Sequence, residues 1–216
     1  MRRPGFTLVE IVIAIAVSGI LFALAVPLAA HGVRTMVFLP RAMAVNQAAA
    51  DVMHQLIEGG FSDSALTGQT IIRGLRSAVR RDASATGGAV WLVEASRVGY
   101  RTSDGLYVVI WRDGGSSTIR RGVIGGASCG PPPSNPASFD TIPYDAAGNG
   151  ITIAPSGTLF VYYGTTGAVI APIGTGCPSA PIRQVEISLT AQTGNGLFDQ
   201  GQAQQTMSSS ATIRVP

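Results

Sequence analysis

The sequence predicts an α+β protein, in which a long N-terminal helix packs on an antiparallel β-sheet head. The first observation is an apolar run without a charged residue from Ile11 to Ala30, about the length that a helix needs to cross the hydrocarbon core. The second is the change of texture from Ala89 onward, where short segments rich in β-branched and aromatic residues are bounded by Gly, Asp or Pro. We therefore expect the first half of the helix to span a membrane and the chain beyond it to form strands.

Beyond the apolar run, the helix is expected to continue as an amphipathic segment. Apolar residues recur at helical spacing on one side, at Val45, Ala49, Val52 and Leu56. Pro27 is expected to kink the helix rather than end it, and Pro40 to start a new helical segment. Gly59 and Gly60 form a natural stop. A second, short helix is expected over residues 70–83, with Ile72, Leu75 and Val79 on its apolar side.

The head is expected to consist of short strands. In the segment 182–191, Val185, Ile187 and Leu189 alternate with polar residues, as in a strand that is buried on one face. A hairpin turn is expected at residues 113–115, a loop-like insertion at 125–150, and a final edge strand at 211–216. The other expected strands are 89–95, 106–112, 117–124, 158–164 and 168–173.

The N-terminus has an unusual order of parts. Arg2 and Arg3 are followed by a small residue, Gly5, and only then by the apolar run. Cleavage after Gly5 would leave the run on the mature protein and place the new amine of Phe6 about one helical turn from Glu10. A rival site at residues 23–25 would release the whole head. The length of the run and a glutamate inside it argue against that rival.

Residues 2–10, with the sequence RRPGFTLVE, resemble the class III leader of type IV pilin-like proteins, which include major and minor pilins and the pseudopilins of type II secretion. The resemblance implies cleavage after Gly5 by a prepilin peptidase, N-methylation of Phe6, a helix-kinking role for Pro27 and packing of the apolar helices into a filament core. It also implies that Glu10 pairs with the Phe6 amine of a neighbouring subunit. The alternative is an interfacial Glu10 near its own helix N-terminus, where the helix dipole favours an anion.

The expected organisation is a leader at 1–5, a spanning and filament-core helix at 6–30, a helical extension at 31–58 and a head at 59–216. We expect a single-pass inner-membrane protein with its N-terminus in the cytoplasm and its head outside, which then enters a pilus or pseudopilus. Its expected partners are other pilin-like subunits and the prepilin peptidase and methyltransferase. Without the leader, 13 arginines face 12 acidic residues, so charge gives no case for nucleic acid as a partner.

The head offers little chemistry for catalysis or metal binding. The two histidines, His31 and His54, precede it, so a Ser-His-Asp or Cys-His nucleophile is excluded there. We expect no enzyme and no cofactor, although a carboxylate pair such as Glu94 with Asp113 stays open. Two cysteines of an exported head, Cys129 and Cys177, are expected to form one disulfide rather than a metal site.

Two weaker candidate sites complete the predictions, each beside a plainer interpretation. Arginines at helical spacing could contact DNA or simply form a solvated face; they are Arg73, Arg76, Arg80 and Arg81. Oxygen-bearing loops could bind Ca²⁺ or simply form turns; their candidate ligands are Asp145, Asn149, Asn195 and Asp199. The predicted function is a minor pilin or pseudopilin. The alternatives are a DNA-uptake filament subunit that binds through these arginines, and a membrane-anchored enzyme or binding domain.

Overall fold

The structure is a computed structural model that describes residues 7–61, 71–78, 89–115, 117–125, 139–142, 150–154, 157–173, 178, 181–193 and 203–213. The chain divides into two compact units, residues 1–41 and 42–216, which are described separately. Several predicted site residues lie outside the described residues: Gly5, Phe6, Arg80, Arg81, both cysteines and the four candidate calcium ligands.

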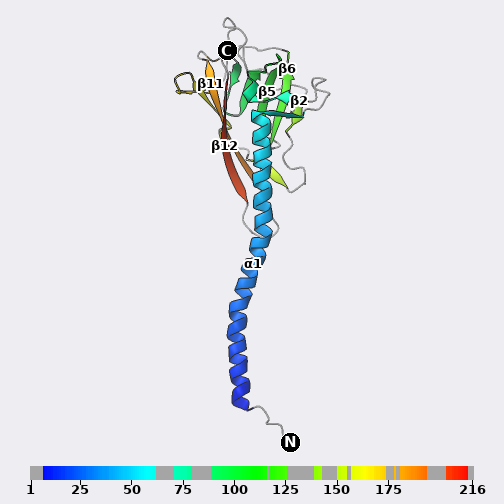
Figure 1. Ribbon diagram of the computed structural model, residues 1–216, viewed down its shortest axis with the longest axis vertical. Coiled ribbons are helices and arrows are strands. Elements are labelled where there is room, and N and C mark those ends of the chain that lie inside the picture. The colour runs from blue at the N-terminus through cyan, green and yellow to red at the C-terminus, as the bar shows by residue number, and fades with distance from the viewer. Residues whose placement is uncertain are drawn as a thin grey trace. The chain divides into compact units, whose positions relative to one another are not determined.

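One uninterrupted α-helix, α1, runs from Leu8 to Ile57 (Figure 1). It passes through Pro27, as predicted, and also through Pro40, so the prediction that Pro40 starts a new helical segment is wrong. A proline inside a helix removes one backbone hydrogen bond, and the remaining bonds on both sides keep the helix continuous when strong helix formers flank it. Pro40 is flanked by such residues, among them Leu39 and Ala42.

The second half of α1, residues 42–57, belongs to the head unit and buries one side. Val45 is 1% exposed, and Ala49, Val52 and Leu56 are 0% exposed, whereas Asp51 is fully on the exposed side. The predicted amphipathic helix is therefore confirmed. It ends at Ile57, before Gly59, whose backbone adopts a positive φ of 101° that favours glycine.

The predicted helix over residues 70–83 is wrong for the part that the structure describes. Residues 71–73 instead form β2 (Ile71–Arg73), which pairs antiparallel with β1 (Gly59–Phe61), and residues 75–77 form a single 3₁₀ turn, η1 (Leu75–Ser77). The β-branched pair at 71–72 favours a strand. Gly74 lies so close to the backbone of Ile57 and Gly59 that a Cβ would collide with both, so the chain can pass here only as glycine.

The first large sheet has the strand order β3-β4-β5-β6-β7 and is antiparallel throughout. The hairpin turn between β5 and β6 is confirmed, with the Gly115 amide donating to Asp113 Oδ1 at 3.1 Å. β4 was not predicted, and β7 lies within the insertion that was expected to be loop-like. The bounds are β3 (Val90–Val93), β4 (Arg97–Arg101), β5 (Tyr107–Asp113), β6 (Thr118–Ile124) and β7 (Phe139–Thr141).

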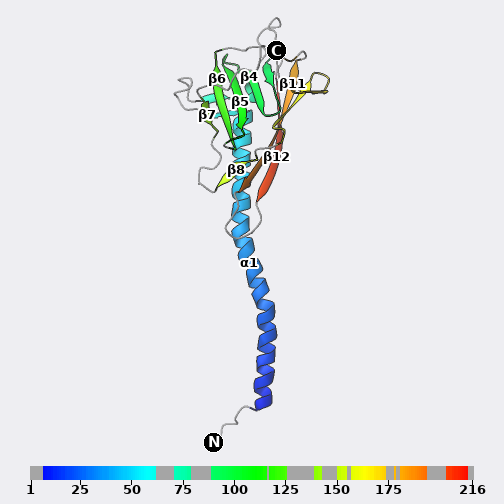
Figure 2. The same cartoon turned by 180° about the vertical axis from the view of Figure 1, so that it is seen from behind.

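The second large sheet has the order β10-β9-β11-β12, with β8 also pairing with β11 (Figure 2). The alternation predicted in β11 is confirmed, because Val185, Ile187 and Leu189 are at most 1% exposed. The final edge strand predicted at 211–216 is confirmed at Ala211 and Thr212, where β12 ends, but β12 begins earlier, at Gln204, in a Gln/Ser/Thr segment without a hydrophobic pattern. Residues 214–216 lie outside the described residues. The bounds are β8 (Ile151–Ile153), β9 (Phe160–Gly164), β10 (Val169–Ile170), β11 (Ile182–Thr193) and β12 (Gln204–Thr212).

Tyr162 on β9 links the two large sheets through the turn between β3 and β4. Its hydroxyl lies 2.9 Å from the carbonyl oxygens of both Glu94 and Arg97, and it accepts a hydrogen bond from the Glu94 amide at 3.3 Å. Burial raises the pKa of Tyr162, because the phenolate would lose its contact with water. Buried residues of both sheets and of helix segment 42–57 form one continuous core.

Candidate assembly site on the N-terminal helix

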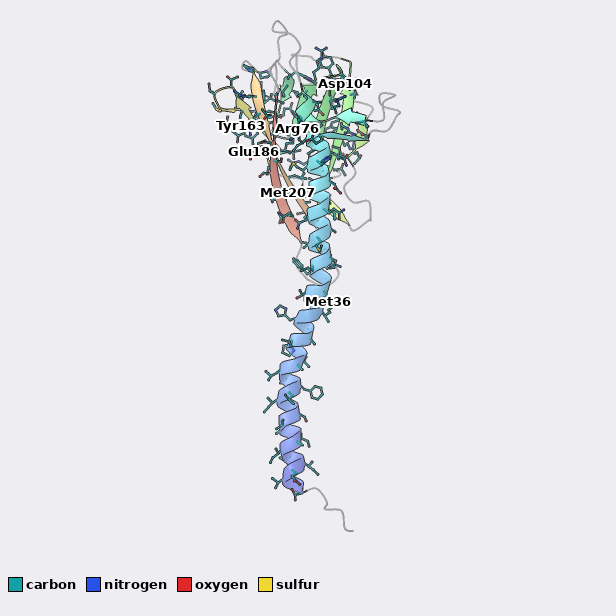
Figure 3. The ribbon with its side chains drawn as sticks, viewed as in Figure 1. Met36, Arg76, Asp104, Tyr163, Glu186 and Met207 are labelled. Carbon is teal, nitrogen blue, oxygen red and sulfur yellow. The ribbon has the colours of Figure 1, made fainter. Side chains whose placement is uncertain are left out.

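The first unit exposes an apolar surface on all sides of its helix. Leu8, Leu28 and Met36 are 79%, 77% and 78% exposed, and α1 has the length and composition to cross a membrane (Figure 3). Removing apolar area from water is favourable by about 25 cal/mol per Å². Side chains exposed in this way fit a helix that is anchored in a membrane.

The helix begins with a capping box formed by Thr7 and Glu10. The amide and hydroxyl of Thr7 each donate to Glu10 Oε2 at 2.9 Å, and the Glu10 amide donates to Thr7 Oγ1 at 3.4 Å. These bonds satisfy backbone donors that every helix leaves open in its first turn. The sequence analysis missed this pair, although the signal is present: a Thr-x-x-Glu spacing directly before an apolar run.

The capping box bears on the two roles considered for Glu10. Both bonds from Thr7 reach Oε2, and the other oxygen, Oε1, accepts no bond from any residue that the structure describes. Glu10 therefore caps its own helix within one chain and keeps an acceptor oxygen for a further donor. The amine of Phe6 lies outside the described residues, so pairing with a neighbouring subunit stays a prediction.

One face of the helix near Glu10 is lined by small residues. A Cβ added at Gly19 would meet nothing within 4 Å, and the neighbouring Ala14 and Ser18 are also small. Small side chains let two apolar helices approach closely, which is the main source of packing energy between helices in lipid. An open depression follows this face along Glu10, Ile11, Ala14, Ile15, Ser18 and Gly19.

Of the four arginines that were predicted to form a helical stripe, the two that the structure describes, Arg73 and Arg76, do not share a helix. Arg73 lies on β2 with its Nε 3.7 Å from an Asp104 carboxylate oxygen, while Arg76 lies on η1 and forms an ion pair with Glu58 (Figure 3). Both side chains are more than half exposed. Among the described residues, this arrangement gives two separate surface ion pairs rather than a continuous basic face.

Glu94 and Asp113, the carboxylate pair that the sequence left open, each lie next to an arginine. Glu94 is held by Arg97, with 2.6 Å between Oε1 and Nη2. Asp113 Oδ2 lies 2.5 Å from Arg120 Nη2 near the turn of the β5–β6 hairpin. Each of these two carboxylates is therefore in an ion pair with an arginine. Within the described ranges, no group of three or more His, Cys, Asp or Glu side chains is placed to hold a metal ion.

The N-terminus of the chain matches a known family model. Residues 1–26 match the prokaryotic N-terminal methylation motif, whereas no curated protein and no solved structure matches the chain. The matched range contains Gly5, Phe6, the capping box and the small-residue face, and it ends just before Pro27. The chain therefore carries a class III prepilin-like leader, and the predicted resemblance of its N-terminus to type IV pilin-like proteins is confirmed.

Proposed function

We propose that this chain is a structural subunit, a minor pilin or a pseudopilin, of a type IV pilus or a type II secretion pseudopilus. The observation that carries the proposal is the methylation motif at the start of a helix whose apolar side chains are exposed on all sides. Such a helix is costly in water and stable in lipid or among similar helices. The inner membrane and other pilin-like subunits provide those two environments in turn.

Processing is the first step of this function. A prepilin peptidase cuts after Gly5 and the new N-terminus, Phe6, is methylated, which leaves the apolar helix on the mature protein. Intact-mass measurement and N-terminal sequencing of membrane-extracted protein should find N-methyl-Phe6. A mature chain that starts at Val26 would overturn both the membrane anchor and the filament subunit.

In the filament, Glu10 selects the axial position of each subunit. An unpaired carboxylate is expensive where water is scarce, and pairing with a neighbour's Phe6 amine offsets that cost only at one stagger. The capping box holds the carboxylate at the start of the helix, with Oε1 available for the amine. Glu10 therefore acts on register more than on fold stability.

Three variants separate pairing from capping, with co-purification in sheared filaments as the measurement and the inner-membrane level as the control. Glu10→Gln keeps an acceptor for Thr7 and removes the charge, while Thr7→Ala removes the cap and keeps the charge. We expect Glu10→Ala and Glu10→Gln to lose incorporation and Thr7→Ala to retain it, with all three at normal membrane levels. Normal incorporation of Glu10→Gln would show that charge pairing has no role. Normal incorporation of Glu10→Ala would remove any assembly role for this residue.

A further inference from the structure

β12 forms a long sheet edge whose backbone alternates between bonded and open residues. The Thr193 amide donates to the Ala203 carbonyl at 3.0 Å, and the Ile213 amide donates to the Arg183 carbonyl at 2.7 Å. These bonds bracket the β11–β12 ladder and show that odd-numbered residues of β12 bond to β11, because bonding alternates along an antiparallel pair. The backbone groups that point away belong to Gln204, Thr206, Ser208, Ser210 and Thr212.

Most of this outer edge carries none of the usual protection, although η1 lies close to part of β12. All five of its residues are exposed, and the contact made there is a hydrogen bond from the Gln205 side chain to the Thr206 carbonyl at 3.3 Å. In natural proteins, charged residues, proline, a bulge or short length usually keep an edge strand from pairing with another chain. β12 has nine residues with no charge, proline or glycine, and its pairing with β11 has no register shift.

The other edges of the large sheets are shorter or already occupied. β10 has two residues and β7 has three. The edge of β3 is occupied by another segment of the same chain, because the Ile173 amide donates a hydrogen bond to the Val93 carbonyl at 2.7 Å. Among the described strands, β12 is therefore the edge best able to accept a whole strand.

The two faces of β12 define the chemistry of a strand that would fit beside it. On the outer face, the hydroxyls of Thr190 and Thr206 lie 2.9 Å apart, in a row of hydroxyl and amide side chains. On the inner face, Ala211 is buried and Met207 packs half-exposed on the core (Figure 3). A fitting strand has uncharged polar residues on the outer face and, on the inner face, a small apolar residue that would cover Met207.

We propose that β12 accepts an extended, uncharged strand from a different pilin-like subunit, so that main-chain hydrogen bonds join two heads in one sheet. The proposal rests on the proposed filament function. Antiparallel pairing with a second copy of β12 is excluded by direction. β12 runs beside helix segment 42–57 in both views (Figures 1 and 2), so antiparallel pairing of two copies would point these segments in opposite directions. Subunits of one membrane-anchored filament share a direction.

Amide hydrogen exchange on the full-length protein tests the open edge directly. In detergent, the amides of Thr206, Ser208 and Ser210 should exchange quickly, while those of Met207 and Ser209, bonded to β11, exchange slowly. In sheared filaments, both sets should exchange slowly. Fast exchange of the three outward amides in filaments would overturn the proposal.

Photo-crosslinking identifies the occupant. Benzoylphenylalanine is placed at Ser210 of the full-length chain in cells, alone or with a second change at Ser208. Ser208→Pro removes an outward amide without touching the β11 ladder, and Ser208→Ala is its matched control. We expect an adduct with an extended segment of another pilin-like subunit, reduced at least about tenfold by Ser208→Pro because the ring blocks strand addition, and unchanged by Ser208→Ala.

Absence of an adduct, an adduct between two copies of this chain, or one that is insensitive to Ser208→Pro would each overturn the proposal. If Ser208→Pro lowers the unfolding temperature of the head, the exchange experiment on the unmodified chain decides. The N-terminus of the same samples is sequenced in parallel. A mature N-methyl-Phe6 without an adduct means that the β12 proposal alone fails, whereas an unprocessed N-terminus means that the proposed function fails.

Discussion

The two halves of α1 share one helical backbone but differ in what covers their side chains. In the first unit, Ile15 and Leu24 are each 67% exposed, whereas Val52 and Leu56 in the head unit are 0% exposed. The first half is apolar all round, and no single surface of its own chain could cover it. The second half is apolar on one side, and the head covers that side. A helix that is apolar on one side can be covered by its own chain, whereas a helix that is apolar all round must be covered by its surroundings.

This difference predicts that head stability and assembly respond to separate sets of residues. Variants of the buried half should change the unfolding of the head, and variants of the exposed half should change membrane insertion or filament incorporation. Four predictions test the separation, in order of decreasing effect on the free energy of unfolding of the head.

The largest effect is expected from the predicted disulfide between Cys129 and Cys177. Its loss in a Cys129→Ser/Cys177→Ser variant should cost about 4 kcal/mol of head stability, because the bond closes a loop of about 49 residues in the unfolded chain. Denaturant unfolding followed by tryptophan fluorescence measures the cost, and non-reducing peptide mapping tests whether the bond exists. Two free thiols in exported protein would refute the bond.

A matched pair of leucine variants compares the two halves of α1 directly. Leu56→Ala should destabilise the head by about 3 kcal/mol, because it removes packed methyl groups and leaves a cavity. Leu21, 62% exposed in the first unit, is the control, and Leu21→Ala should leave head unfolding unchanged. Denaturant unfolding of the full-length protein in detergent measures both. An equal loss of head stability in both variants would contradict the predicted difference between the two halves of α1.

Tyr162→Phe tests how much the hydrogen bonds of the Tyr162 hydroxyl contribute to the stability of the head. The substitution leaves the carbonyls of Glu94 and Arg97 without the hydroxyl between the two sheets, so we expect a loss of about 1–2 kcal/mol. Tyr163→Phe is the control, because its hydroxyl bonds Glu186 on the outer face at 2.6 Å, and removing a surface bond costs less (Figure 3). A smaller loss for Tyr162→Phe than for the control would contradict the linking role.

Raising the pH to 10 should weaken the head by the smallest amount. Burial raises the pKa of both Tyr100 and Tyr162 above the unfolded value of about 10. The neutral form is therefore favoured by folding, and its contribution is complete below about pH 10 and is lost progressively as pH rises further. At pH 10 the loss should be about 0.8 kcal/mol for the two residues together. Unfolding measured between pH 8 and pH 11 checks it, and Tyr162→Phe should flatten the decline.

Pattern and periodicity predicted the elements in which side chains alternate strongly between environments. The long apolar run, the buried side of helix segment 42–57 and the alternating strand β11 follow directly from the spacing of apolar residues. Predictions failed where tertiary contacts outweighed local preference. Residues 71–73 have helical spacing with Leu75, yet they pair with β1 because Gly74 sits against the end of α1. β12 has almost no hydrophobic pattern, and its pairing with β11 makes it a strand.

The candidate assembly site could be predicted from the sequence because its parts are close together along the chain. The leader, the glutamate and the apolar helix lie within 26 residues, so their relation depends on sequence distance and not on folding. The capping box is equally local, and its Thr-x-x-Glu spacing was available but not used. By contrast, the stripe of arginines depended on a helix that tertiary contacts replaced, so Arg73 and Arg76 were placed on the wrong kind of element.

The sequence by itself determined the N-terminal helix, its leader and the side of helix segment 42–57 that faces the head. Each depends on residues within a few turns of one another, and local spacing fixes which side chains share a face. Only the tertiary structure decided that Tyr162 joins two sheets across 68 residues of chain to Glu94 and that β12 presents an open edge. Whether a strand is inside a sheet or at its edge depends on which distant strands pair with it, and no local pattern contains that information.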